Sequence, residues 1–197
     1  MEEIEEFERK HIEAVVAIHL SSLPTDFLPS LGKEFLSELF YPAVISSKYA
    51  NGLVYVIDGK CIGFVIITYD STKFLLEVIR SKPILFFSHL LRYALSSLEN
   101  FIFLIHLAKS LFTNKSEKGF AEIYVIAVEK SCRGKGIGNT LVNASILQAR
   151  NQGKLGIGIK TLITNYEWVN YFIKRDWLKT LEFTIHKNTY VTLRKVF

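Results

Sequence analysis

Apolar residues along this chain recur with two periods, one typical of strands and one typical of helices. The period of two predicts strands over residues 53–57, 61–69, 121–128, 157–164, 178–185 and 190–196. The helical period predicts helices over residues 31–41, 140–150 and 166–174, and several more within 73–112. Residues 2–20 fit either a short strand followed by a helix or one longer helix, so only the helical part through Leu20 is common to both. This order of elements predicts a mixed α/β domain.

Turn residues mark where several of these elements begin and end. Asp58-Gly59 joins the first two predicted strands, and both residue types tolerate the positive φ of a tight hairpin turn. Ser30 is the expected N-cap of the helix over 31–41, which we expect to end at Pro42.

Residues 73–112 differ from the rest of the chain, because these 40 residues include 10 Leu and 6 Phe. The segment divides at Pro83 and again near Ser96 and Glu99, which have capping-box spacing. Its middle part places five apolar residues on one helical face: Ile84, Phe87, Leu91, Ala94 and Leu98. A transmembrane hairpin is excluded because Arg92 and Glu99 interrupt the apolar run. We expect a helical insertion packed on the domain, in preference to a segment lying on a membrane or a partner.

Composition indicates one globular domain. The chain has 197 residues, of which 49% are hydrophobic, and this excludes intrinsic disorder. We expect a single domain over 1–197, with 73–112 as an insertion and 113–118 as a polar linker. Cys61 and Cys132 are too few for a disulfide framework and lack metal-ligand spacing. With no apolar signal segment at the N-terminus, we expect a reduced, cytoplasmic protein without a metal.

The run Arg133-Gly134-Lys135-Gly136-Ile137-Gly138 lies between a predicted strand and the helix over 140–150. Its three glycines allow close approach to a ligand, and the following helix offers free N–H groups and a positive dipole end. With two cations, the run predicts a phosphate site. No Walker loop is present, and a dinucleotide fingerprint fails because its last glycine is replaced by Asn139.

The net charge of +5 supports an anionic ligand at this loop. Six basic residues and no acidic residue occur between Lys130 and Tyr166, and the rest of the chain has 18 basic against 19 acidic residues. The six are Lys130, Arg133, Lys135, Arg150, Lys154 and Lys160. The excess charge therefore argues for a cofactor and against nucleic acid.

The spacing [Q/R]-x-x-G-x-[G/A], read as Arg133 to Gly138 with Ala127-Val128 upstream, resembles motif A of the GNAT superfamily of acyl-CoA-dependent N-acetyltransferases. The order of elements is similar too, apart from residues 73–112. The resemblance implies a mixed, splayed central β-sheet flanked by helices, with a helical insertion between the third and fourth strands. It also implies acetyl-CoA as the cosubstrate.

The same resemblance implies roles for individual residues. Backbone groups of Ile126, Ala127 and Val128 would pair with the pantetheine arm of acetyl-CoA. A backbone N–H near Val128 would polarise the thioester carbonyl as an oxyanion donor. The pyrophosphate would be held by the loop residues Arg133, Gly134, Lys135, Gly136, Ile137 and Gly138.

Direct acetyl transfer to an amine requires a base that accepts the amine proton. Glu122 is the candidate, because it resembles the strand Glu that acts as base in the superfamily's histone-lysine enzymes. Strand alternation would place Tyr124, Ile126 and Val128 on its face. A Glu that faces solvent at the edge of a strand fits the pattern equally well.

A second signature of the superfamily is only partly matched. Asn165 and Phe172 fit it in character and are expected to line the pantetheine and cysteamine region. Phe172 stands where the superfamily commonly has a Tyr that protonates the CoA thiolate, which Phe cannot do. Trp168 and Asp176 also depart from the pattern, in place of a small residue and a glycine.

We therefore expect an N-acetyltransferase that transfers an acetyl group from acetyl-CoA to a primary amine. An amino sugar, a small amine and a protein amine all remain open as the acceptor. The loop over 22–29 and the insertion over 73–112 are expected to shape the acceptor site. Because of Phe172 and Asp176, an acyl-CoA-binding regulatory module with weak or lost catalysis is the alternative.

Overall fold

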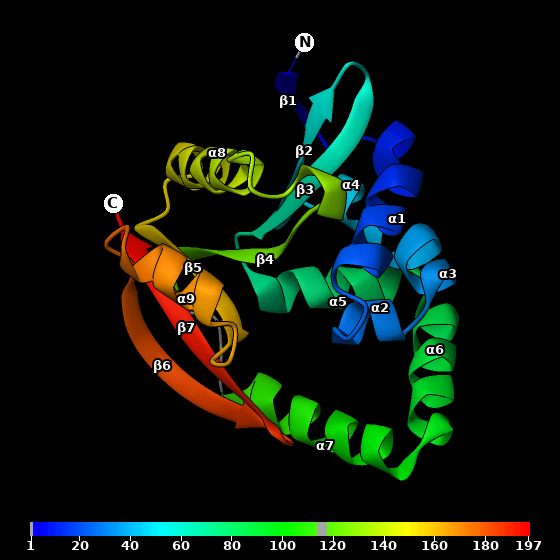
Figure 1. The fold of residues 1–197 in the computed structure, drawn as a ribbon. Helices are drawn as coiled ribbons and strands as arrows, with labels where there is room; N and C mark the ends of the chain where they lie inside the picture. Colours follow the sequence, from blue (N-terminus) through cyan, green and yellow to red (C-terminus); the bar gives the residue numbers. More distant parts are fainter. Residues whose placement is uncertain (1, 114–117) are drawn as a thin grey trace.

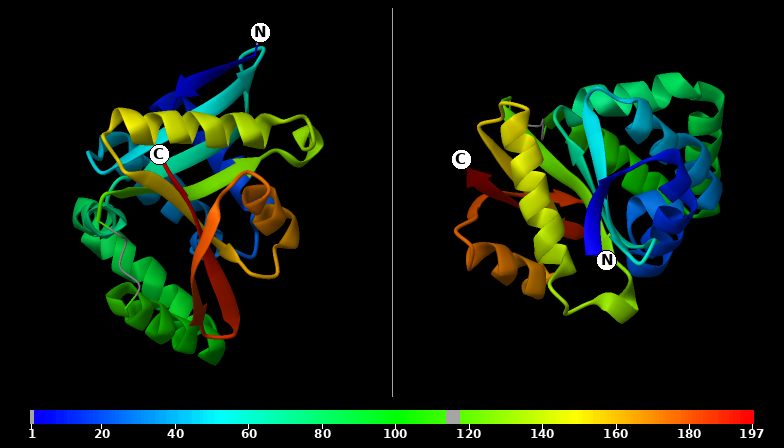
Figure 2. Two further views of the ribbon diagram at one scale, coloured as in Figure 1. Left: turned by 90° about the vertical axis from the view of Figure 1, so that its left-hand side faces the viewer. Right: turned by 90° about the horizontal axis from the view of Figure 1, so that it is seen from above.

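One seven-stranded sheet with helices on both faces organises the chain (Figures 1 and 2). The computed structural model describes residues 2–113 and 118–197, so most of the predicted polar linker lies outside the described residues. The strands are β1 (Glu2–Glu6), β2 (Ala50–Ile57), β3 (Lys60–Thr68), β4 (Phe120–Val128), β5 (Gly156–Leu162), β6 (Leu178–Ile185) and β7 (Asn188–Val196). The helices are α1 (Ile12–Ser22), α2 (Phe27–Ser30), α3 (Lys33–Phe35), α4 (Tyr41–Ser46), α5 (Ser71–Ser81), α6 (Pro83–Ser96), α7 (Leu98–Thr113), α8 (Ile137–Asn151) and α9 (Tyr166–Ile173).

The sheet has the strand order β1-β2-β3-β4-β5-β7-β6, and β4 with β5 is its parallel pair. The neighbouring pairs on either side are antiparallel. This mixed α/β sheet, with helices between β3 and β4, confirms the predicted fold class. At the N-terminus, the strand-plus-helix alternative is the correct one.

Two apolar cores lie on opposite faces of the sheet. Helices α1, α4, α5 and α6 cover one face, where Val16, Val44 and Phe74 are buried with Phe64 of β3. Helices α8 and α9 cover the other, where Leu141 and side chains from β3, β4, β5 and β7 are buried. Figure 2 shows α8 and α9 on one side of the sheet and the earlier helices on the other.

The predicted turns are confirmed in one place and wrong in another. Asp58 and Gly59 both have positive φ, 49° and 78°, and join β2 to β3 as expected. The helix predicted over 31–41 instead begins at Lys33 and continues through a π-helical turn into α4. Pro42 does not end it, because it lies in the first turn of α4, directly after the π turn, where an N–H donor is dispensable.

The insertion consists of α5, α6 and α7, and α6 begins at Pro83 as predicted. The cap before α7 is Ser97 and not Ser96, since the Asn100 N–H donates to Ser97 Oγ at 3.1 Å. The apolar face predicted to be buried is wrong for most of its members: Ile84, Phe87, Leu91 and Leu98 are exposed. Helix α6 instead buries Phe86 and His89. Apolar residues occur on more than one face of α6, so hydrophobicity alone could not choose between its faces.

Helix α7 connects the insertion to the far end of the sheet. Glu99 accepts from Lys187 Nζ at 2.5 Å, and the rings of His106 and His186 lie 5.7 Å apart. Both partners belong to the β6–β7 hairpin. Figure 1 shows α7 running from α6 toward this hairpin along the lower edge of the molecule. None of the described helices is both long and apolar enough to cross a membrane.

Candidate functional site

Strands β4 and β5 separate partway along their length, and this opens the candidate site. Their pairing begins at Phe120 and Gly156 and ends at Ile123 and Ile159, although both strands continue beyond this point. A β-bulge at Tyr124 follows immediately, since Ile123 and Val125 face consecutive β3 residues and Tyr124 faces none. A bulge bends its strand and increases its twist, which accounts for the divergence of β4 from β5.

The bulge also changes which side chains of β4 share a face. Tyr124 packs against the core beneath α1 and α5, whereas Ile126 and Val128 pack against the core beneath α8. Glu122 lies opposite Thr68 of β3, two residues before Tyr124 and on the same face as it. The prediction that Ile126 and Val128 share the face of Glu122 is therefore wrong, because an extra residue reverses the alternation.

Backbone groups of two residues predicted to bind the cofactor point into the gap. The Glu129 N–H donates to the Ile62 carbonyl of β3 at 2.8 Å. Since backbone groups alternate between the two edges of a strand, those of Val128 and Ile126 are directed away from β3, toward the gap. Those of Ala127 are directed to β3, and its side chain is buried. Ala127 therefore has no group available to a ligand in the gap.

The glycine-rich loop lies at the end of β4, directly before α8. Gly134 and Gly136 have φ values of 79° and 84°, which side-chain-bearing residues rarely adopt. A Cβ placed on either would meet nothing within 4 Å, so the space beside both is open. Within the described chain, the N–H groups of residues 134–139 have no backbone acceptor. Helix α8 also lacks a side-chain cap. These donors lie at the positive end of a 15-residue helix, an arrangement suited to an anion.

Arg133 connects this loop to the ends of β4 and α1. Its Nε donates to the Val128 carbonyl at 3.3 Å, and its Nη2 to the Ser22 carbonyl at 3.4 Å. Ser22 Oγ donates to the same Val128 carbonyl at 3.1 Å. The guanidinium is thus used partly to fix the loop, a role the sequence did not predict.

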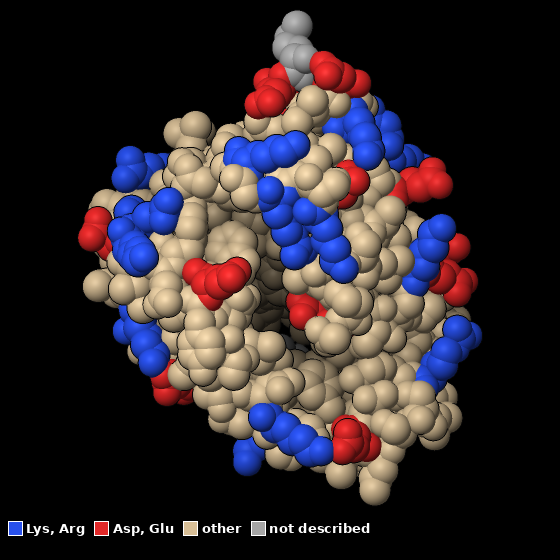
Figure 3. Space-filling view, viewed as in Figure 1, with Lys and Arg blue, Asp and Glu red and all other residues tan. Residues whose placement is uncertain are grey.

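A deep hollow opens beside the gap on the face seen in Figure 3, with basic side chains gathered above it. Asp26, just before α2, and Tyr190, on β7, come from opposite halves of the molecule and interact electrostatically. Burial raises the pKa of Asp26 above its usual value. Burial also raises the pKa of Tyr190, and Asp26 acts in the same direction. No sequence pattern indicates this pair, because 163 intervening positions separate two residues that only the fold brings together.

Glu122 is held by an ion pair that the sequence did not predict. Lys160 Nζ of β5 lies 3.1 Å from each carboxylate oxygen of Glu122, whose side chain is 13% exposed. On the same face, burial raises the pKa of Tyr124 to about 12, and Glu122 acts in the same direction. Alternation along β5 could have indicated Lys160, since Ile157 and Ile159 face the opposite core.

Asn165 and Phe172, the two residues near α9 that were predicted to line the pantetheine region, differ in exposure. Asn165 is exposed at the start of α9, and its Nδ2 donates to Thr161 Oγ1 at 3.3 Å. Phe172 is fully buried, with its ring 4.5 Å from that of Trp177, so it has no surface with which to contact a ligand. The prediction that Phe172 lines the pantetheine region is not supported by this packing. The neighbouring Tyr171 donates to Asn139 Oδ1 at 2.6 Å.

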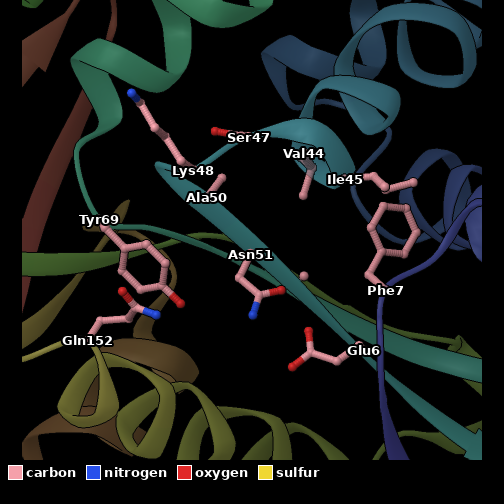
Figure 4. A pocket seen from close by; sticks show the side chains of 11 residues that line it. Glu6, Phe7, Val44, Ile45, Ser47, Lys48, Ala50, Asn51, Tyr69 and Gln152 are labelled. Carbon is pink, nitrogen blue, oxygen red and sulfur yellow. The ribbon is translucent and has the colours of Figure 1, made fainter.

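A separate cavity of about 320 Å³ lies near the start of β2 (Figure 4). Tyr69 and Gln152 line it from one side and Asn51 and Glu6 from the other. It is at the end of β3 away from the glycine-rich loop. None of the residues predicted from the sequence lines this cavity. Among the described residues, no three His, Cys, Asp or Glu side chains are grouped as metal ligands would be.

Comparison with protein families gives one match, and it covers most of the chain. The sequence profile of the Acetyltransferase (GNAT) family matches residues 13–172. This range contains the glycine-rich loop, the diverging strands and Glu122. A search of curated proteins finds no match.

Solved structures with the same fold cover nearly the whole chain at low sequence identity. Ard1 from Thermoplasma volcanium is 18% identical with a TM-score of 0.62, over 99% of this chain and 97% of its own. The ribosomal-protein-S18-alanine N-acetyltransferase from Escherichia coli is 10% identical with a TM-score of 0.62, over 100% and 94%. A candidate streptothricin acetyltransferase from Bacillus anthracis str. Ames, in complex with acetyl coenzyme A, is 13% identical with a TM-score of 0.62, over 100% of both chains.

Proposed function

The chain belongs to the GNAT family of acetyl-CoA-dependent N-acetyltransferases, and on this premise we propose that it transfers an acetyl group from acetyl-CoA to a primary amine by direct attack. The observation that carries the proposal is the gap between β4 and β5, which ends beside an array of unpaired N–H groups. A long ligand with an amide-rich arm and a phosphate end fits these two features together.

Acetyl-CoA is held in this proposal mainly by backbone groups. The N–H groups of residues 134–138 donate hydrogen bonds to the pyrophosphate oxygens, with Lys135 adding charge and Arg133 fixing the loop. The backbone of Ile126 and Val128 pairs with the pantetheine arm as a neighbouring strand would. The Val128 N–H, directed into the gap, is the donor for the thioester oxygen as negative charge develops on it.

Glu122 is the proposed general base. The amine nitrogen bonds to the acetyl carbon, the C–S bond breaks, and the amine proton passes to the Glu122 carboxylate through water, because Glu122 and Val128 are six residues apart along β4. Lys160 orients the carboxylate through contacts to both oxygens. CoA leaves as the thiolate, since Phe172 offers no proton and is buried. A thiolate is a tolerable leaving group near neutral pH.

The acceptor enters from the hollow in Figure 3 in this proposal. We assign to its recognition Asp26 before α2, Tyr190 of the hairpin and Tyr93 of the insertion, because Asp26 and Tyr93 both interact electrostatically with Tyr190; the Tyr93 ring is 5.5 Å from that of Phe27. A carboxylate among aromatic rings favours a cationic amine. Amino sugars, small amines and protein amines remain acceptors to test. One structural relative is named for acetylating an alanine of ribosomal protein S18.

Calorimetry with CoA, followed by a thiol-release assay on a panel of amines, tests the proposal. The panel includes amino sugars, small alkyl and aryl amines, and peptides with free N-termini or lysines. We expect CoA binding and turnover on at least one class, with the N-acetyl product identified by mass spectrometry. CoA binding without turnover on every acceptor would instead support the regulatory module. Absence of CoA binding would contradict both functions.

A further inference from the structure

A stripe of large apolar side chains is exposed along the outer face of α6. Its members are Ile84, Phe87, Leu91 and Leu95, which are 58–87% exposed and recur at the helical spacing of three to four residues. The opposite face of α6 is fixed on the domain by Phe86 and by His89, whose Nδ1 is 3.0 Å from the Leu31 carbonyl. Helix α6 therefore has one apolar face packed on the domain and a second apolar face that is largely exposed.

The exposed face continues along α7. Leu98, Phe101 and Ile105 are 51–74% exposed and again spaced as one helical face. Phe103 points the other way, with its ring 5.5 Å from that of Phe27. We call the seven exposed residues of the two helices the α6–α7 stripe. Large apolar side chains exposed in this number on two consecutive helices are unusual for a monomeric domain, and larger exposed apolar patches mark contact with a partner or a membrane.

Basic residues accompany the α6–α7 stripe. Residues 80–113 contain four basic residues, Arg80, Lys82, Arg92 and Lys109, and one acidic residue, Glu99. Glu99 is already paired with Lys187. In the part of the chain that the structure describes, neither Arg80 nor Arg92 forms an ion pair, and both are exposed. Apolar side chains therefore share this surface with uncompensated positive charge.

We propose that the α6–α7 stripe docks on the surface of an anionic membrane. The stripe would enter the boundary between headgroups and acyl chains, while the arginines, with long flexible stems, would reach the lipid phosphates. Anionic lipid complements the charge of Arg80 and Arg92. A second copy of the chain, docked through the same stripe, would bring these arginines toward their own counterparts, which opposes pairing. The proposal does not depend on the acetyltransferase activity.

Vesicle sedimentation with the full chain tests this proposal. One set of vesicles contains phosphatidylcholine alone, and the other an equimolar mixture of phosphatidylcholine and phosphatidylglycerol. We expect the wild-type chain to sediment with the mixed vesicles and much less with the neutral ones. Leu91→Asp/Leu95→Asp should reduce the bound-to-free ratio by about tenfold or more, because charge replaces inserted apolar surface.

Matched variants separate docking from general effects of charge and folding. Leu147→Asp/Leu155→Asp places the same charges at two other exposed leucines, 60% and 62% exposed, and should bind as the wild type does. Arg80→Gln/Arg92→Gln should weaken binding to the mixed vesicles several-fold, whereas Arg9→Gln/Lys48→Gln should change it much less. CoA affinity of each variant reports that the fold is intact.

Three outcomes would overturn the proposal. The first is no binding of the wild-type chain to either kind of vesicle. The second is equal loss of binding in the two leucine pairs. The third is a wild-type dimer in light scattering that becomes a monomer in Leu91→Asp/Leu95→Asp without any vesicle binding, which would assign the α6–α7 stripe to a second copy.

Discussion

Lys160 and Glu122, on the parallel strands β5 and β4, form an ion pair in which the ammonium nitrogen is 3.1 Å from both carboxylate oxygens. The pair lies at the point where the two strands separate, since Glu122 is in the last paired segment and Lys160 directly follows it. The carboxylate proposed as the base is thus fixed by the last paired segment of the sheet. Two predictions follow from this arrangement.

Replacing Glu122 with Gln should lower kcat on the order of a hundredfold, because the amide cannot accept the amine proton. CoA affinity, measured by calorimetry, should not change, since Glu122 is remote from the glycine-rich loop. Glu13→Gln, at an exposed position of α1, serves as the control and should leave kcat unaltered. An unchanged pH–rate profile in Glu122→Gln would remove Glu122 as the base.

Replacing Lys160 with Met should lower kcat several-fold while leaving the KM for acetyl-CoA unchanged. The carboxylate then loses the contact that orients it, and positioning errors reduce the rate of proton transfer. Lys160→Arg, which keeps a cation, should restore most of the lost rate. If Lys160→Met and the wild type had the same kcat and the same KM for acetyl-CoA, the ion pair would have only a structural role.

Gly136→Glu should abolish CoA binding, since the new side chain occupies the open space beside the loop and repels phosphate. The φ of 84° should also cost about 1–2 kcal/mol of folding stability. Gly153→Glu is the control, because Gly153 also has positive φ, 65°, with open space beside it, but lies beyond the other end of α8; it should lose stability similarly and keep CoA affinity. Wild-type CoA affinity in Gly136→Glu would contradict the assignment of the loop.

Asp176, three residues after the end of α9, occupies a backbone position that favours glycine, with φ at 62°. Asp176→Gly should therefore raise the free energy of unfolding by about 0.5–1 kcal/mol in urea denaturation. Asp70→Ala should instead lower the free energy of unfolding by about 1 kcal/mol, because Asp70 Oδ1 accepts from the Lys73 N–H at the start of α5. The opposite signs distinguish backbone strain from a general effect of removing acidic charge.

Stability should decrease in mild acid because of His19. Burial lowers the pKa of His19 to about 4, below the value of about 6.5 expected in the unfolded chain. The unfolded chain therefore binds more protons between these values. Stability is complete above the unfolded pKa and declines as the pH falls toward the folded pKa. The loss attributable to His19 should be about 2 kcal/mol from about pH 7 to about pH 5.

Urea unfolding of the wild type and His19→Gln at both pH values measures this contribution. Gln keeps a polar group near Tyr41 Oη, which is 2.8 Å from His19 Nδ1. The variant should be less stable near neutral pH and should show a shallower pH dependence. Identical pH dependence in the two proteins would contradict the role assigned to His19.

Local patterns predicted most of the strands and the loop, because each depends on neighbouring residues. The hairpin at Asp58-Gly59 and the loop around Gly136 are examples, since their φ values follow from the residue types. The bulge at Tyr124 was not predictable, because it depends on pairing with β3, and its effect reversed the face expected for Ile126 and Val128.

The remaining errors concern choices that only tertiary contacts make. Helix α6 is apolar on more than one face, and its inner face is selected by Phe35 and Leu31, which contact His89. Phe172 matched a binding signature by its position, but packing with Trp177 buries it completely. Lys160 reaches Glu122 only because β4 and β5 are parallel neighbours, which is a property of topology.

The divergence of β4 from β5 bears on how sequences of this fold can drift apart. The groups that β4 directs into the gap belong to the main chain, and nearly every amino acid supplies the same N–H and C=O. Substitution along β4 is therefore constrained by the two cores and by Glu122, and hardly at all by ligand contact. Structures that share this fold over nearly the whole chain at 10–18% identity show how far sequences can diverge while the fold is kept.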